Sequence, residues 1–257
     1  MIGRTIRLPG LRAQATITTD RWGIPHIRAA GLHDLFFVQG FAAARDRLWQ
    51  IDLWRKRGLG RLAASFGPGF LAQDRAARLF LYRGDMAAEW EAYAPDAEVI
   101  CTAFATGINA FVAWAEDEPA RLPPEFTLTD TRPERWEPAD VVRIRTHGLV
   151  RNAASELLRT IVAGQGIDDA LRKRPDPAVP AASPPDLHGL APEALRTYQL
   201  ATSPVSFDPA RLRATLAEAE RWSDVSDAGE VVELEGSNNW AVSPGCLVVR
   251  HPWHDPR

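Results

Sequence analysis

Residues 35–58 read LFFVQGFAAARDRLWQIDLWRKRG, and this stretch is the clearest indication of a helical fold. Apolar side chains recur every three to four residues, as on the buried face of a helix; they are Leu35, Val38, Phe41, Ala42, Leu48 and Trp49. Asp34 is a favourable N-cap and Gly58 a favourable stop. Basic residues 55–57 suit the negative end of a helix dipole. We therefore predict one long helix from Asp34 to Gly58.

Two short strands precede this helix. Residues 15–18, ATIT, and residues 25–29, PHIRA, contain β-branched side chains in short alternating runs. The four residues 20–23, DRWG, lie between them, and Gly23 supplies the backbone freedom of a turn. Pro25 is compatible with an edge strand.

Further helices are predicted after residue 95. Residues 96–117 have an apolar face made of Ile100, Phe104, Ile108, Phe111 and Ala115. After prolines 119, 123 and 124, another helix is predicted to start near Pro138. Its apolar side comprises Val142, Leu149, Val150, Leu157 and Ile161. Residues 1–162 are therefore expected to form a mainly helical body.

The composition changes after residue 162. Residues 175–209 contain eight prolines, and the stretch RPDPAVPAASPPD has few large apolar side chains. We interpret residues 163–236 as a spacer, interrupted by one short helix at 209–222. Residues 237–257 form a third segment.

The overall composition limits the function classes. Of the 257 residues, 46% are hydrophobic and 25% charged, and the net charge of −3 gives no general attraction to nucleic acid or anionic membranes. No apolar run of membrane-spanning length and no signal peptide are evident, so a cytoplasmic protein is expected. A periplasmic or secreted protein is the alternative if the natural start lies upstream. The cysteines, Cys101 and Cys246, indicate neither a disulfide framework nor a metal site.

Few residues outside the C-terminal region are candidates for chemistry. The sequence contains no P-loop, dinucleotide-binding glycine motif, zinc-protease helix or nucleophile elbow. His251, His254 and Asp255 are a weak metal candidate, because prolines surround them near the end of the chain. His26, within a predicted strand, is interpreted as a structural residue.

The stretch LEGSNNWAVS, residues 234–243, has two interpretations. Gly, Ser and Asn are typical turn residues, so GSNN can simply be a turn before a strand. However, cutting the bond between Gly236 and Ser237 would give an N-terminal serine. Its α-amine, with an ordinary pKa near 8, could accept the proton of its own hydroxyl group. One residue would then supply both nucleophile and base.

Several segments together resemble the penicillin acylase (penicillin amidase) family. They are DRWGIPHIRA, VQGFAAARDRLWQIDLWRKRGLGRLAASFG, RPERWEPADVV, HGLVRNAASELLR and EGSNNWAV, in the order in which the family has them. These N-terminal-nucleophile hydrolases are made as one precursor and are cut into an α and a β chain. The resemblance implies an α+β fold class: the mainly helical α-chain part of an αββα hydrolase.

The resemblance also implies roles for particular residues. Ser237 would be the catalytic nucleophile and the first residue of the β chain, and Gly236 would precede the cut. Glu156 matches a glutamate that binds a structural Ca²⁺ in the family. Leu149 and Val150 are candidates for the substrate pocket. Residues 45–47, Arg-Asp-Arg, would pair their charges inside the helical body.

The chain departs from the family after Ser237. Only residues 238–257 follow the expected nucleophile, whereas the family continues for several hundred residues that build the β-sheet sandwich and the oxyanion donors. The sandwich is therefore expected to be largely missing. We expect a truncated fragment that alone neither cuts itself nor hydrolyses amides.

The functional prediction is an acyl-amide hydrolase acting on small-molecule β-lactam or related N-acyl amides, whose β chain is absent here. The alternatives are an N-acyl-homoserine-lactone acylase, a non-catalytic helical fragment that binds a separately encoded β chain, and an unrelated helical domain in which GSNN is only a turn.

Overall fold

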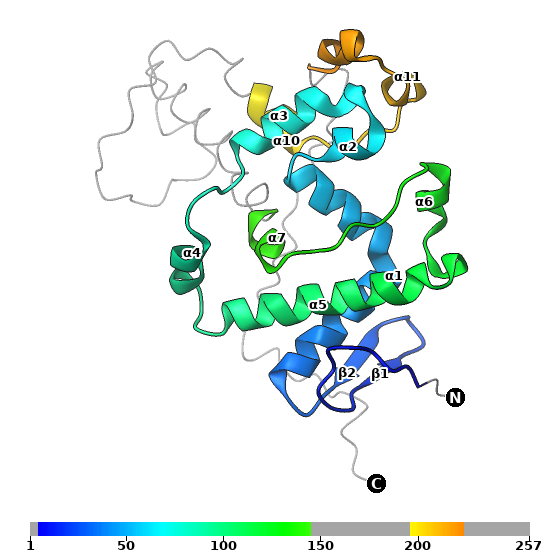
Figure 1. Cartoon of the computed structure of the whole chain (residues 1–257), viewed down its shortest axis with the longest axis vertical. Coiled ribbons are helices and arrows are strands. Elements are labelled where there is room, and N and C mark those ends of the chain that lie inside the picture. Colours follow the sequence, from blue (N-terminus) through cyan, green and yellow to red (C-terminus); the bar gives the residue numbers. More distant parts are fainter. Residues whose placement is uncertain (1–4, 145–195, 224–257) are drawn as a thin grey trace, which may run out of the picture.

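The structure is a computed structural model that describes residues 5–144 and 196–223 (Figure 1). Most of this part is helical, with one small antiparallel sheet. In chain order the elements are β1 (Thr16–Thr19), β2 (Pro25–Arg28), α1 (Leu32–Gly58), α2 (Leu62–Phe66), η1 (Pro68–Phe70), α3 (Leu71–Leu79), α4 (Met86–Ala92), α5 (Ala97–Glu116), η2 (Pro119–Arg121), α6 (Pro124–Leu128), α7 (Pro138–Arg143), α10 (Arg196–Thr202), α11 (Pro209–Leu212) and η5 (Leu216–Trp222).

The strands β1 and β2 confirm the predicted hairpin. They pair in antiparallel register from Thr16 opposite Arg28 to Thr19 opposite Pro25. The carboxylate of Asp20 accepts hydrogen bonds from the backbone amides of Trp22 and Ile24, at 2.8 and 3.0 Å, and so closes the connection. Gly23 has a φ of 81° in this turn, a conformation that L side chains disfavour.

The start of α1 differs from the prediction. The helix begins at Leu32 with Gly31 as its N-cap, so Asp34 lies in the first turn and is not the cap. The Asp34 carboxylate instead accepts the backbone amides of Arg12 and Ala13, at 3.0 and 2.9 Å. These bonds, the Arg12 amide first, lower the pKa of Asp34. Asp34 therefore fastens the N-terminal segment to the helix.

The helices α1 and α5 cross at close range and form the centre of the core (Figure 1). Glycines make the crossing possible. A methyl group added to Gly107 would lie 1.8 Å from the Phe37 carbonyl oxygen, and one added to Gly40 would lie 2.0 Å from the Phe104 carbonyl oxygen. Beside the crossing, the rings of Phe41 and Phe111 meet edge to face at 5.3 Å.

The apolar composition of α5 corrects one expectation from the sequence, that no run long and apolar enough to span a membrane occurs. Its residues Ala97–Glu116 are long and apolar enough to cross a membrane by length and composition, although no such run was expected. Ile108, Phe111 and Val112 are nevertheless buried against the rest of the helical body. The contacts with α1 are those of a core helix.

A second packing region joins distant parts of the chain. The Trp49 ring of α1 lies 6.1 Å from Phe66, 5.0 Å from Phe126 and 6.0 Å from Phe207, measured between ring centroids. Phe207 belongs to the segment predicted as a spacer. Residues 196–223 are therefore part of the packed body where the structure describes them.

The short elements of this segment also differ from the prediction. The single helix expected at 209–222 is split into α11 and the 3₁₀ helix η5. The helix α10, which was not predicted, packs on α3. The predicted domain boundaries at residues 162 and 236 lie outside the described residues and stay predictions.

The predicted fold class is confirmed at the level of a mainly helical fragment. The αββα arrangement stays a prediction, because the described residues contain one two-stranded sheet. The start of the helix predicted near Pro138 is confirmed by α7, which has a capping box between Glu137 and Asp140. Its predicted continuation lies outside the described residues.

Candidate functional site

The site residues predicted from the sequence all lie outside the described part of the structure. They are Ser237, Gly236, Glu156, Leu149 and Val150. Their roles therefore stay predictions. The weak metal candidate at His251, His254 and Asp255 also lies outside. Among the described residues, no group of three or more His, Cys, Asp or Glu side chains could hold a metal ion.

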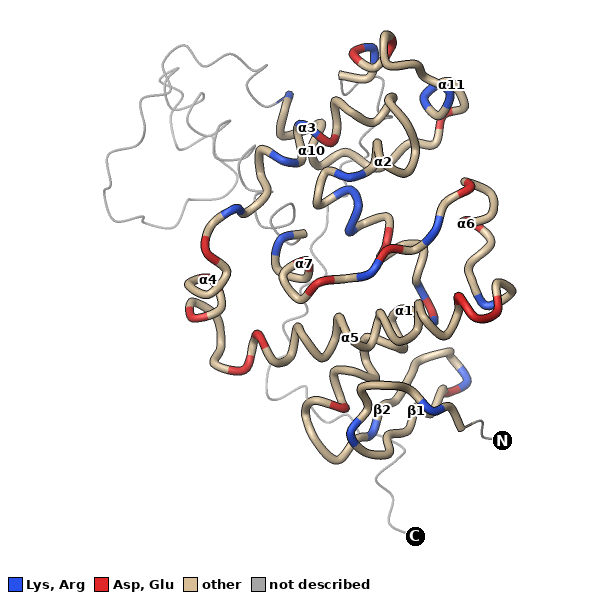
Figure 2. The backbone as a smooth tube through the Cα atoms, viewed as in Figure 1, with Lys and Arg blue, Asp and Glu red and all other residues tan. Residues whose placement is uncertain are grey.

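The described residues contain a network of buried charges. It joins the last turns of α1 to the segment that leads into α7, and Figure 2 shows the two charged stretches side by side. Lys56 and Asp52, both about 1% exposed, form an ion pair of 2.7 Å. The Lys56 ammonium also donates to the Arg132 carbonyl oxygen at 3.1 Å, and the Glu134 amide donates to Asp52 at 3.1 Å.

Arg55 is the second cation in this network. Its Nε donates to Asp140 at 2.6 Å and its Nη1 to Glu134 at 2.9 Å. Burial alone would lower the pKa of the Arg55 guanidinium, but the hydrogen bonds and charges of Asp140 and Glu134 raise it. Burial raises the pKa of Asp52, against the opposing effect of Lys56.

This network corrects the charge pairing expected for residues 45–47. Arg45 pairs with the adjacent Asp46 at 2.7 Å, but both side chains are partly exposed to solvent. The charges inside the body are those of Asp52, Arg55 and Lys56. Sequence reasoning assigned Arg55 and Lys56 to the helix dipole. The acidic partners of Arg55, Glu134 and Asp140, lie some 80 residues further along the chain, whereas Asp52, the partner of Lys56, lies one turn earlier on the same helix.

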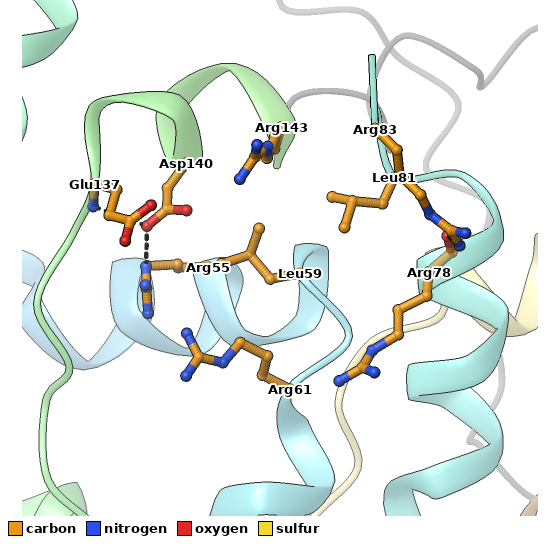
Figure 3. Close-up of a pocket in the computed structure, with 9 residues that line it drawn as sticks. All are labelled: Arg55, Leu59, Arg61, Arg78, Leu81, Arg83, Glu137, Asp140 and Arg143. Atoms are coloured by element: carbon orange, nitrogen blue, oxygen red, sulfur yellow. Dashed lines mark hydrogen bonds and ion pairs between the residues drawn. The ribbon is translucent and has the colours of Figure 1, made fainter. Parts of the chain in front are cut away.

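Beside the network lies an open hollow of about 540 Å³, which we call the arginine hollow (Figure 3). It lies between the end of α1, the end of α3 and α7. Its lining residues are Arg55, Leu59, Arg61, Arg78, Leu81, Arg83, Glu137, Asp140 and Arg143. Arg61 reaches it from the link between α1 and α2, Arg78 from α3, and Arg143 from α7.

The two acids of the hollow already have partners. Asp140 accepts from Arg55 and from the Glu137 amide, at 2.6 and 2.9 Å. The Glu137 side chain accepts the backbone amide of Asp140. Within the described part of the chain, the hollow therefore has an excess of positive charge.

Among residues 5–144 and 196–223, Arg78, Arg83 and Arg143 form no ion pair, although the charge of Arg78 acts on the nearby Asp74 and lowers its pKa against the larger effect of burial. Arg78 donates its Nε to the Gly60 carbonyl oxygen at 2.9 Å, and Arg83 donates to the Arg78 carbonyl oxygen. The Nε of Arg143 is buried and has no hydrogen-bond partner within the part of the chain that the structure describes. Arginine stays protonated near neutral pH, so this group of side chains can bind oxyanions but cannot act as a general base.

Other residues considered from the sequence have structural surroundings. His26 lies on β2 with its Nε2 at 3.2 Å from Asp20, in the hairpin connection. Cys101 is a half-buried free thiol whose pKa is raised by burial. Neither residue is among those that line the arginine hollow.

Comparison with known proteins assigns the family. The family model described as Penicillin amidase matches residues 14–246, which is most of the chain. The chain belongs to the penicillin amidase family. The matched residues include the hairpin, all the described helices and the Gly236-Ser237 pair.

Curated relatives agree with this family. The chain is 33% identical to penicillin acylase 2 proenzyme from Pseudomonas sp. (strain SE83), over 96% of this chain and 30% of that protein. It is 32% identical to penicillin G acylase from Escherichia coli, over 53% of this chain and 17% of that protein. It is 28% identical to acyl-homoserine lactone acylase QuiP from Pseudomonas aeruginosa, over 92% of this chain and 26% of that protein. The chain thus spans less than a third of the length of these relatives.

A solved structure supports the same assignment. The thermostable penicillin G acylase from Alcaligenes faecalis matches with a TM-score of 0.53 and 25% identity, over 65% of this chain and 98% of the matched chain. Members of the penicillin amidase family include penicillin acylases and acyl-homoserine lactone acylases, which are amide hydrolases.

Sequence reasoning missed the arginine hollow. Its five arginines lie at positions 55, 61, 78, 83 and 143, in segments that no local pattern brings together. Arginine is also common throughout this chain, so a single arginine gives no signal by itself. The only available indication was the basic character of residues 55–61, which is also typical of a helix end.

Proposed function

We propose that this chain supplies the α-chain and linker part of an N-terminal-nucleophile acylase, with Ser237 as nucleophile after a cut at the Gly236–Ser237 bond. The observation that carries the proposal is the family match, which extends from residue 14 through Ser237 to residue 246. The proposed reaction is hydrolysis of the amide bond in β-lactam or related N-acyl amides.

The chemistry follows from an N-terminal serine. In its neutral form the α-amine accepts the proton of the Ser237 hydroxyl as the Oγ attacks the substrate's amide carbonyl. When the C–N bond breaks, that proton goes to the leaving amine, and an acyl-enzyme ester remains. The α-amine then accepts a proton from water as the water oxygen attacks the ester. It gives this proton to the Ser237 Oγ when the acyl–oxygen bond breaks and the carboxylic acid leaves.

The proposed acylase needs groups outside the described residues. Oxyanion donors contribute about 3–4 kcal/mol each to acyl transfer. Leu149 and Val150 are proposed to contact the acyl group, and Glu156 to hold a structural Ca²⁺ with other oxygen ligands. No step of the proposed reaction passes through this ion.

An acyl-homoserine lactone is the second candidate substrate. It is favoured by the similarity to QuiP, which covers 92% of this chain, nearly as much as the similarity to penicillin acylase 2 proenzyme. Both substrate classes contain an amide with an acyl side chain, so the proposed nucleophile serves either.

A chimera tests processing and activity together. Residues 1–246 of this chain are continued by the corresponding β region of the Pseudomonas penicillin acylase 2 proenzyme, and mass spectrometry is used to find new N-termini. We expect a new N-terminus at Ser237 and hydrolysis of an N-acyl β-lactam. Ser237→Ala is expected to abolish both, because it removes the hydroxyl group.

Ser243→Ala is the matched control, since Ser243 lies in the same segment and is not preceded by glycine. It should leave processing and hydrolysis unchanged. A chimera that folds but keeps an intact Gly236–Ser237 bond would contradict the proposal. Hydrolysis rates for an N-acyl β-lactam and an N-acyl-homoserine lactone, measured side by side, distinguish the two substrate classes.

A further inference from the structure

The arginine hollow has more basic than acidic side chains in its lining. Arg61, Arg78, Arg83 and Arg143 face a volume of about 540 Å³, while its two acids, Glu137 and Asp140, are already bonded within the network. Arg61 has one acidic contact, with Glu134 at 3.2 Å, and its side chain is 45% exposed. The buried Nε of Arg143 has no hydrogen-bond partner among the described residues. Because an unpaired cationic donor that is shielded from water is costly, an oxyanion is the ligand class that fits.

The chain contains an acidic segment directly after its last described residue. Residues 224–235 read DVSDAGEVVELE and carry five carboxylates, at Asp224, Asp227, Glu230, Glu233 and Glu235. No lysine, arginine or histidine occurs between residues 223 and 249. The segment itself thus contains no positive charge, and the nearest basic residue along the chain is Arg221, three residues before Asp224.

The spacing of these carboxylates suits binding along a surface. The first four recur every three residues. A chain in the polyproline II conformation has three residues per turn and rises about 3.1 Å per residue. In that conformation the four carboxylates would share one face, about 9 Å apart. Each of these carboxylates could then bind a different arginine around the hollow.

The segment starts close enough to reach the hollow. The last described helix of the chain, η5, is joined to α3 by the ion pair of Arg75 with Glu220, at 2.6 Å. Arg78, which lines the hollow, lies one turn further along the same helix. An extended chain of twelve residues spans up to about 40 Å, so residues 224–235 are long enough to enter the hollow.

We propose that the acidic segment 224–235 of this chain binds in the arginine hollow. Charge complementarity favours this occupant, and so does connectivity. Because the segment is tethered to the same chain, its effective concentration at the hollow is in the millimolar range. A free anion would have to be supplied at about that concentration to compete with it. Arg61, Arg78, Arg83 and Arg143 are the expected contacts of its carboxylates.

One consequence rests on the proposed function. The segment ends immediately before the Gly236–Ser237 bond. Its binding would restrict where that bond can lie relative to α3 and α7 before the proposed cut. The binding itself does not require any cut, so the two proposals can fail separately.

Hydrogen exchange followed by mass spectrometry tests the binding. The full chain carries Ser237→Ala, so that processing does not affect the result. In 20 mM salt, the backbone amides of 224–235 are expected to exchange about tenfold more slowly than in 0.5 M NaCl, since salt screens charge pairs. Arg83→Glu combined with Arg143→Glu should remove this protection. Adding Asp227→Arg and Glu230→Arg to that variant should restore part of it.

Arg28→Glu is the control, because it reverses an exposed charge on β2, away from the hollow. It should leave the exchange of 224–235 unchanged. If circular dichroism shows that the charge-reversal variant does not fold, the neutral variant Arg83→Gln with Arg143→Gln is used in its place. It should also reduce the protection of 224–235. Equal exchange of 224–235 in all variants and salts would overturn the proposal. A second outcome would also overturn it: 5 mM inorganic phosphate slows the exchange of the amides around the hollow, while the amides of 224–235 stay unprotected. The hollow would then bind free oxyanions and not the acidic segment.

Discussion

At the scale of single residues, two ion pairs on the same helix differ in how far they are buried. Asp52 and Lys56 are about 1% exposed, whereas the side chains of Arg45 and Asp46 are 33% and 37% exposed. Removing one partner of a buried pair leaves an uncompensated charge in a medium that solvates it poorly. An exposed pair is screened by water, and its loss changes little.

Asp52→Asn is therefore expected to lower the free energy of unfolding by about 3 kcal/mol, measured by urea denaturation. Asp46→Asn, the matched control, should cost less than about 1 kcal/mol. Combining Asp52→Asn with Lys56→Met should recover part of the loss, because the unpaired ammonium is removed as well. A double variant less stable than Asp52→Asn would show that the uncompensated charge is not the cause.

At the scale of elements, the crossing of α1 and α5 depends on the absence of two side chains. A Cβ at Gly107 would lie 1.8 Å from the Phe37 carbonyl oxygen, and one at Gly40 would lie 2.0 Å from that of Phe104. Both obstacles are backbone atoms, so a change of rotamer cannot relieve the clash. The helices would have to separate, which would loosen the contact of Phe41 with Phe111.

Gly107→Ala is expected to destabilise the chain by about 3 kcal/mol through overpacking, although alanine has the higher helix propensity. Thermal unfolding followed by circular dichroism measures the effect. Gly31→Ala is the control, because nothing lies within 4 Å of its added methyl group. It should cost less than about 1 kcal/mol. An increase in stability from Gly107→Ala would be incompatible with the close crossing.

At the scale of the whole molecule, Arg211 joins residues 196–223 to the helical body. This fully buried side chain donates to the Gly69 carbonyl oxygen at 3.0 Å and to the Gln73 side chain at 2.9 Å. Its guanidinium also lies 4.0 Å from the centroid of the Phe70 ring. Burial lowers the pKa of Arg211 to about 10, so the group is still protonated near neutral pH.

Arg211→Ala is expected to release residues 196–223 at a cost of about 3 kcal/mol, the usual upper value for hydrogen bonds to a charged group. Limited proteolysis should cut this segment first, while the helical content of the body is kept. Arg213→Ala, at an exposed neighbouring position, is the control and should resist proteolysis like the original chain. Equal cleavage of the two variants would mean that Arg211 does not hold the segment.

The sequence by itself determined the parts of this protein that depend on local chemistry. The hairpin around Gly23, the extent of α5 and the start of α7 at Pro138 follow from turn residues, apolar periodicity and capping. The resemblance to penicillin amidases was also readable from short motifs in order, including Gly236-Ser237, and the family match confirms it.

Only the tertiary structure decided how charged residues distant in sequence meet. Asp34 matched the local pattern of an N-cap, but it binds the amides of Arg12 and Ala13 some twenty residues away. Arg55 meets Asp140, and Arg211 meets Gly69, across 85 and 142 positions of sequence. Local patterns cannot encode such pairs, because a charge that looks solvated in the sequence becomes buried only when another segment covers it. For the same physical reason the arginine hollow emerged only once α1, α3 and α7 were brought together.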